Sequence, residues 1–246
     1  MTHTTVLSVR GHASLTVAPD EAVVSCQLRT VGPDKAAALG TASAALEAVV
    51  AVLAGLGGTV LPSDGRRVAL GWVATSVTSF AETRFDQGKH EPTPTGRVVA
   101  TVDLTIRVRD LPLLDRLGDT LAGHDTVHVT HVRWLVDDDN VAWGSVRATA
   151  IAAAIQKGTD YASALGGSLT SIDQVADAGL LDGSRTADHV GFQALAASGV
   201  GFGAEGATPS LDPVPQELPA VIDARFSASV ADLAGGSAHG AKRVTP

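Results

Sequence analysis

The chain has 246 residues, of which 45% are hydrophobic, 18% charged and 4% aromatic, and its formal net charge is −8. These apolar side chains suffice for a buried core, and the length fits one domain with two subdomains. Because the charge balance is acidic, there is no cationic field to attract nucleic acid, and we expect no nucleic-acid partner.

Two strands are predicted at the start of the chain. Residues 6–17 have an extended pattern, which we expect to be broken at Gly11. Residues 22–28 alternate apolar and polar side chains, as a half-buried strand does, and the alternation turns Cys26 inward. An inward thiol usually packs as a small hydrophobic group, so burial is favoured over a reactive role for Cys26.

A helix and a hairpin follow. The Gly-Pro-Asp sequence at residues 32–34 opens a helix with the proline in its first turn, and two glycines end it at residues 57–58. Residues 68–80 and 97–108 are strand-like, and the second segment alternates strictly, with a polar face turned to solvent or to a neighbouring subunit. The polar residues 86–94 between them predict a hairpin with a long tip.

The second half of the chain predicts two more helices and three more strands. Residues 110–123 are typical of a short capped helix, and residues 127–136 of a strand. An alanine-rich helix at about 140–165 is the longest element of this half. Residues 171–176 and 218–230 are extended, and the strict alternation of the last segment requires a place in a sheet.

These elements predict an α+β fold in which antiparallel strands pack against helices, including the long alanine-rich helix near the carboxyl end. We expect a single domain over residues 1–246, with an ordered core at about 5–180 and 218–233. Residues 182–217 are rich in Gly, Ser, Ala and Pro without periodicity, which predicts a flexible excursion, and residues 234–246 are expected to be a frayed tail.

Histidines and acidic residues are the candidates for a metal site. His124, His128 and His131 form the densest cluster, but side chains an odd number of residues apart on a regular strand point to opposite faces. That geometry separates His128 from His131. The acidic run at residues 137–140 lacks the ligand spacing, turn glycine and distal glutamate of a calcium loop, so capping of the following helix explains it better.

No other motif predicts catalysis. No serine lies in a Gly-x-Ser-x-Gly elbow, and the glycine-rich residues 201–206 lack the flanking strand and helix of a nucleotide fingerprint. Trp72, Trp134 and Trp143 are candidates for a pocket or a subunit contact, with core filling favoured for Trp134. We assign no catalytic, cofactor-binding or metal-binding residue, and expect a protein that is not an enzyme and holds no cofactor.

Cysteine content and hydropathy bear on location. One cysteine cannot form an internal disulfide, and the first residues have neither the basic nor the apolar region of an export signal. No stretch reaches the roughly 20 apolar residues of a membrane span, because Asp, Arg, Gly or Pro interrupts every run. We therefore expect a cytoplasmic protein without a membrane span.

Several short motifs, in their order and spacing, resemble the SIMPL domain family over most of the chain. They are Val9-Arg10-Gly11, Pro19-Asp20-Glu21-Ala22, the strand from Gly96 to Val108, Arg147-Ala148-Thr149-Ala150 through Lys157, Tyr161-Ala162 and Ala164-Leu165-Gly166. The resemblance implies antiparallel strands packed on helices. Members are commonly described as periplasmic or outer-membrane immunogenic proteins, some assemble into ring-like or channel-like oligomers, and others are linked to oxidative-stress tolerance.

The family has no catalytic residues that could be transferred to this chain. Two departures from its pattern stand out: the export signal of its periplasmic members is missing, and Ala13 replaces the second glycine that often follows the first motif glycine. Both departures argue against a periplasmic role.

Three hypotheses of function follow. The leading one is a non-enzymatic, stress-related homo-oligomer, since strands with exposed edges and polar second faces need covering. The second is a module that binds another protein through the loops at residues 86–94 and 182–217, because loops on a rigid scaffold readily carry binding. An uncharacterised metal-dependent or hydrolytic enzyme is the least favoured, because it rests only on scattered His and Asp residues.

Overall fold

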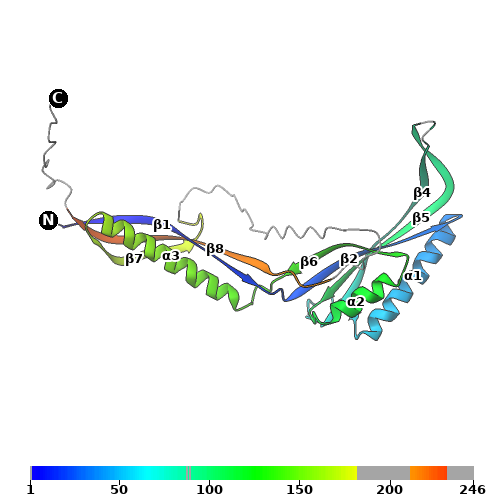
Figure 1. Cartoon of the computed structure of the whole chain (residues 1–246), viewed down its shortest axis with the longest axis horizontal. Helices are drawn as coiled ribbons and strands as arrows, with labels where there is room; N and C mark the ends of the chain where they lie inside the picture. Colours follow the sequence, from blue (N-terminus) through cyan, green and yellow to red (C-terminus); the bar gives the residue numbers. More distant parts are fainter. Residues whose placement is uncertain (1, 87, 89, 182–210, 232–246) are drawn as a thin grey trace, which may run out of the picture. The chain divides into compact units, whose positions relative to one another are not determined.

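The computed structural model describes residues 2–86, 88, 90–181 and 211–231, which form two compact units (Figure 1). One unit comprises residues 2–16, 139–181 and 217–231, and the other comprises residues 17–138 and 211–216. The described chain contains two sheets, antiparallel except for the short pairing of β3 with β4, and three helices, so the predicted α+β class is confirmed.

Two predicted segments lie largely or wholly outside the described residues. The expected flexible excursion at residues 182–217 is described only from residue 211 onward, and the expected frayed tail at residues 234–246 is not described. The glycine-rich residues 201–206 also lie outside the described part of the chain.

The larger unit is a five-stranded sheet with two helices on one face. Its strand order is β3-β4-β5-β2-β6, in which β2 pairs antiparallel with both β5 and β6. The elements are β2 (Glu21–Gly32), α1 (Lys35–Gly55), β3 (Thr59–Val60), β4 (Leu70–Asp86), β5 (Glu91–Val108), α2 (Leu113–Ala122) and β6 (Val127–Leu135). Alternate residues of β2 and β5 join apolar residues of both helices in one core, which leaves the opposite face of the sheet to the polar residues.

Helix α1 differs from expectation at its start and in its hydropathy. It begins at Lys35, and the side chain of Asp34 caps it by accepting from the Ala37 N–H at 2.8 Å, so Pro33 precedes the helix instead of lying in its first turn. With 21 residues and a mean hydropathy of 1.8, α1 is long and apolar enough to cross a membrane by length and composition. The prediction that no stretch reaches this level is therefore wrong for α1, whose hydropathy comes from its leucines and valines together with many alanines.

The large aliphatic side chains of α1 turn toward the sheet. Val49 and Leu53 are buried in the core of this unit, and Leu39 and Leu46 pack against it, whereas the exposed positions hold mainly Ala, Ser, Thr and Gly. This distribution is typical of a helix that covers one face of a sheet in a folded domain.

The smaller unit is a three-stranded sheet, in the order β1-β8-β7, with helix α3 beside it. Its elements are β1 (Thr2–Val17), α3 (Ala142–Ala164), β7 (Ser168–Asp177) and β8 (Gln216–Ala231). The long alanine-rich helix predicted from the sequence is thus α3. Every fourth residue on its buried face is small or medium-sized: Ala142, Val146, Ala150, Ala154, Gly158 and Ala162.

Small residues let α3 approach the sheet closely. Strand β1 continues through Gly11 without interruption, so the predicted break is wrong. A Cβ at Gly11 would collide with the Ala150 carbonyl oxygen and lie 2.8 Å from the Ala154 backbone nitrogen, which explains the glycine by packing instead of by a turn. On β8, Phe226 is 1% exposed and fills the space beside Gly158.

Candidate functional site

The face of the five-stranded sheet opposite α1 and α2 carries a row of polar side chains. Gln27 of β2 donates to Asp103 of β5 at 3.0 Å, and Ser76 of β4 donates to the other oxygen of that carboxylate at 2.5 Å. The hydrogen bonds from Ser76 and then Gln27 hold the pKa of Asp103 below its ordinary value. Because each carboxylate oxygen already accepts a hydrogen bond, Asp103 is a weak proton acceptor and a poor general base.

The three clustered histidines separate into two groups. His124 lies beyond the end of α2, whereas His128 and His131 lie on β6 opposite Gln27 and Ser25 of β2. The register shifts by one residue between those two pairs, so both side chains lie on the same face, where both residues are exposed. The prediction of opposite faces is wrong, because it assumed a strand without a bulge. Within the described ranges, no three His, Cys, Asp or Glu side chains are grouped to hold a metal ion.

The acidic run at residues 137–140 divides between two roles. Asp137 accepts from both terminal nitrogens of Arg109, at 2.5 and 2.7 Å, and these hydrogen bonds lower the pKa of Asp137. The side chain of Asn140 accepts from the Ala142 N–H at 2.9 Å, at the start of α3. The N-cap residue of α3 is Val141, which makes no side-chain cap hydrogen bond, so Asn140 accepts this N–H from the position before the cap. The carboxylate of Asp137 binds an arginine of the sheet instead.

A second carboxylate completes this charged cluster. Glu21 is 2% exposed, and its two oxygens accept from Arg107 at 2.5 and 2.6 Å, with Arg109 3.5 Å away. The cluster joins the ends of β2, β5 and the segment after β6. Since each carboxylate has an arginine partner, it compensates buried charge and holds the sheet ends together.

The buried cysteine is unreactive. Cys26 is 2% exposed, faces the helix-covered side of the sheet, and has a pKa raised to about 12 by that burial. A thiol with such a pKa stays protonated at neutral pH and is neither a nucleophile nor a metal ligand. The predicted inward position of Cys26 is confirmed.

The hairpin of β4 and β5 projects beyond its neighbours as a two-stranded ribbon (Figure 1). The last pair between β5 and β2 joins Val98 to Gly32, and the pairing of β4 with β5 continues to Asp86 opposite Glu91. We call residues 82–86 and 91–97 the β4–β5 arm. The long polar tip predicted at residues 86–94 is therefore wrong, since most of that segment is strand.

Prolines at alternate positions permit this longer strand. Pro92 and Pro94 lie two residues apart on β5, so their backbone nitrogens point to the same side. In the arm, β5 pairs with β4 along one edge only. Prolines whose nitrogens point to the opposite edge of β5 remove no hydrogen bond from the ladder with β4. A sequence pattern that reads as a loop thus fits an edge strand.

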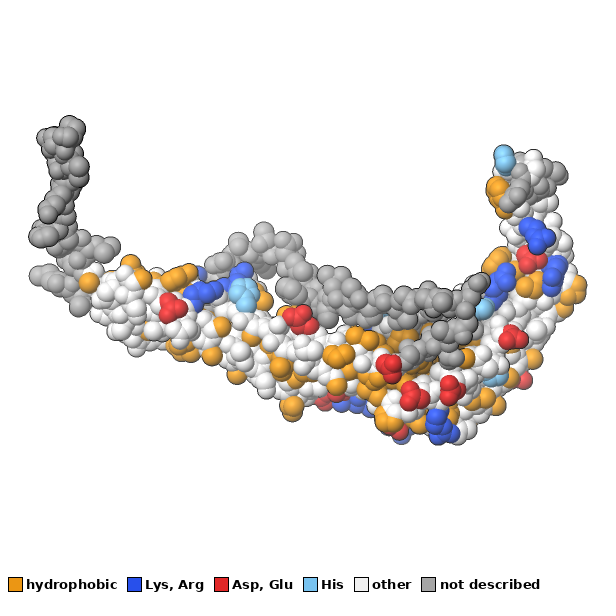
Figure 2. Space-filling model, viewed as in Figure 1, with side chains coloured by type: hydrophobic (Ala, Val, Ile, Leu, Met, Phe, Trp, Pro, Cys, Tyr) orange, Lys and Arg blue, Asp and Glu red, His pale blue; other side chains and the backbone are white. Residues whose placement is uncertain are grey.

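Apolar side chains are exposed on and beside the arm. Phe85 is 61% exposed at the arm, while Phe80 and Val77 are 53% and 60% exposed on the adjoining part of β4. Beyond Trp72, no strand in the described ranges pairs with the outer edge of β4. Figure 2 shows hydrophobic side chains among charged ones at the surface of the β4–β5 arm. An open strand edge with exposed aromatic groups is a typical association surface.

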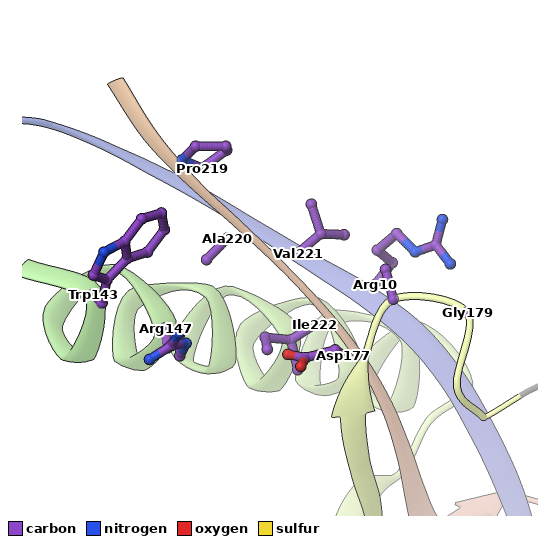
Figure 3. A pocket seen from close by; sticks show the side chains of 10 residues that line it. Arg10, Trp143, Arg147, Asp177, Gly179, Pro219, Ala220, Val221 and Ile222 are labelled. Atoms are coloured by element: carbon purple, nitrogen blue, oxygen red, sulfur yellow. The ribbon is translucent and has the colours of Figure 1, made fainter. Parts of the chain in front are cut away.

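The three tryptophans have separate environments. Trp134 is 4% exposed and belongs to the core of the larger unit, as the sequence favoured, and Trp72 packs against that core. Trp143 instead lines a pocket of the smaller unit (Figure 3), where the guanidinium carbon of Arg147 lies 5.7 Å from the centre of its ring.

Sequence reasoning missed the charged residues of this pocket. In the sequence, Arg147 is only part of a family motif, with no function assigned to it. A Trp and an Arg four positions apart on a helix, as Trp143 and Arg147 are, nevertheless indicate that both lie on one face. Arg10 binds Asp223 across two strands through paired contacts of 2.6 and 2.9 Å, and no local signal joins residues so distant in sequence. Asp177, at the end of β7, gave no signal either.

A protein-family model matches most of the chain. The family model described as SIMPL, protein of unknown function (DUF541), matches residues 7–226. The match takes in most of both units, and it confirms the resemblance drawn from the motifs. No curated protein matches the chain.

Proposed function

Because the chain belongs to the SIMPL family, whose function is unknown, we propose that it acts as a non-enzymatic homo-oligomer joined through the β4–β5 arm. The arm is the observation that carries the proposal. A two-stranded ribbon is at best marginally stable in water and gains stability when a third strand or another surface covers it.

Two copies related by a two-fold axis would place the same edge of β4 in each copy side by side. Such an interface is self-complementary, since the free N–H and C=O groups of one edge match those of the other. Val77 and Phe80 lie opposite Val102 and Val99 of β5, so they point to opposite faces of β4, and side chains of the partner's β4 would cover part of each.

The chemistry of the most conspicuous side chains supports assembly over catalysis. Cys26 is buried with a raised pKa, and the carboxylate of Asp103 is occupied by Ser76 and Gln27. A single free cysteine also fits a reducing compartment, so the proposal includes a cytoplasmic location, without a membrane span. Any link to oxidative stress would then act through assembly instead of through the thiol.

Light scattering coupled to size exclusion tests the proposal. We expect the full chain to form a defined multimer at micromolar concentration, and the double substitution Phe80→Ser with Phe85→Ser to dissociate it. Tyr161→Ser is the matched control, since Tyr161 is 51% exposed on α3 in the other unit. A wild-type chain that stays monomeric over a range of salt, or a variant of unchanged mass, would contradict the proposal.

The alternative of binding a different protein uses the same arm, because residues 86–94 form its end. Retention of a foreign protein by the wild-type chain but not by the Phe80 and Phe85 variant, with the wild-type chain monomeric, would favour that alternative. Fractionation of cells expressing the untagged chain tests the location, and recovery outside the cytoplasm would contradict that part of the proposal.

A further inference from the structure

The smaller unit contains a pocket of about 480 Å³ between α3, β8 and the turn that follows β7 (Figure 3). Its walls are mostly apolar and come from Trp143 of α3 and from Pro219, Ala220 and Ile222 of β8. This volume lies in the usual range for small-molecule sites, which combine apolar walls with a few charged groups. All the lining residues belong to one unit.

One charge of the pocket is already neutralised. Arg10 donates to both oxygens of Asp223, and the Gly179 N–H donates to the same carboxylate at 2.8 Å. Arg10 and the Gly179 backbone therefore keep the pKa of Asp223 below its ordinary value, with Arg10 the larger influence. These hydrogen bonds hold the turn after β7 at the rim of the pocket.

Two other charges of the pocket are not neutralised in the described part of the chain. Arg147 lies over the Trp143 ring, but no carboxylate of the described residues is within ion-pair distance of it. The side chain of Asp177 likewise has neither an ion pair nor a hydrogen bond among those residues. Figure 3 shows the Asp177 carboxylate on the side of the pocket toward α3, with Ile222 between it and Arg147.

We propose that this pocket binds a small zwitterion with an apolar body, of the class of free hydrophobic amino acids or their dipeptides. Arg147 would hold the carboxylate, because a guanidinium offers paired donors that match its two oxygens. Asp177 would hold the ammonium group, and the apolar body would lie against Trp143 and Ile222. A multiply charged anion is disfavoured there, since the Asp177 carboxylate repels it.

Titration calorimetry on the full chain tests the site with named probes. L-phenylalanine and L-leucyl-L-leucine carry both charges and distinguish a free amino acid from a dipeptide. N-acetyl-L-phenylalanine lacks the ammonium group, and L-phenylalaninamide lacks the carboxylate. We expect one of the zwitterions to bind with a dissociation constant in the millimolar range or below, and the acetyl and amide derivatives to bind about tenfold more weakly or worse.

Substitutions assign each charge. Arg147→Gln should weaken zwitterion binding about tenfold, whereas Arg116→Gln, on an exposed position of α2 in the other unit, should leave it unchanged. Asp177→Asn should remove the preference for L-phenylalanine over its N-acetyl derivative, a change that a purely structural role would not produce. Circular dichroism of each variant shows whether it is folded.

Three results would overturn the proposal. They are failure of both zwitterions to bind the wild-type chain at millimolar concentration, equal binding of the N-acetyl derivative by the wild-type chain, and unchanged binding by folded Arg147→Gln. The proposal does not depend on assembly through the β4–β5 arm, because the pocket and the arm belong to different units.

Discussion

Replacing Gly11 with alanine tests the close packing of β1 against α3. The added Cβ would collide with the Ala150 carbonyl oxygen and lie 2.8 and 2.9 Å from the backbone nitrogen and Cβ of Ala154. Two of these atoms belong to the helix backbone and cannot rotate away, so α3 must shift off the sheet. Overpacking of this kind costs up to about 3 kcal/mol, and the lower chain entropy of alanine in the unfolded state returns about 0.5–1 kcal/mol. The net loss is therefore about 2 kcal/mol.

Urea titration followed by hydrogen exchange measures this loss where it occurs. Peptides from β1, α3 and β8 should lose protection in Gly11→Ala, while peptides from β2 and β5 in the other unit should not. Gly144→Ala is the control in the same helix, since a Cβ there meets no atom within 4 Å, and it should stabilise by about 0.5–1 kcal/mol. Unchanged stability and protection in Gly11→Ala would refute the packing argument.

Three further predictions concern the buried and paired groups. Glu21→Gln should lower the free energy of unfolding by about 2 kcal/mol, because the half-exposed Arg107 loses its charged partner. Urea titration measures this change, with Glu47→Gln at an exposed position of α1 as the control. Cys26 should resist iodoacetamide at pH about 8 until urea unfolds the chain, and equal labelling of the folded and the unfolded chain would contradict this. Because burial raises the pKa of the thiol, the stability that its protonated form contributes should be present below about pH 8.5 and fall as pH rises toward 12. The pKa of Asp223 is lowered by Arg10, so the pair stabilises above the ordinary aspartate pKa of about 3.9 and the benefit is lost in acid. Asp223→Asn should therefore flatten the dependence of unfolding on pH below about 4, and a variant with the wild-type slope would count against the pair.

Most elements of the fold follow from local sequence pattern. Strict alternation in β5 and β8 identifies them as strands with one buried face, because side chains of a strand point alternately to two sides. The same alternation places Cys26 inside. The run of alanines marks α3, since alanine has the highest helix propensity. The resemblance to the SIMPL family rests on the order of these elements and is confirmed by the family match.

The errors arise where a residue's reason lies outside its own segment. Gly11 predicts a strand break, but glycine is needed there because helix α3, more than a hundred residues later in the chain, packs directly against it. The prolines of the β4–β5 arm read as a loop, because only the end of the β2 pairing shows that this part of β5 is an edge. His128 and His131 share a face only because the ladder with β2 shifts register, a property of the pair of strands and not of either one.

The candidate binding site is the part that tertiary structure alone decides. Local pattern determines which residues are strand or helix and which side chains face a core. The pocket, by contrast, joins Arg147 of α3, Asp177 of β7 and Ile222 of β8, whose separation along the chain no short-range rule bridges. Their proximity comes from the order β1-β8-β7 and from the small residues that let α3 lie close to that sheet. Charge placement across strands is thus set by packing, whereas element type is set by the local sequence.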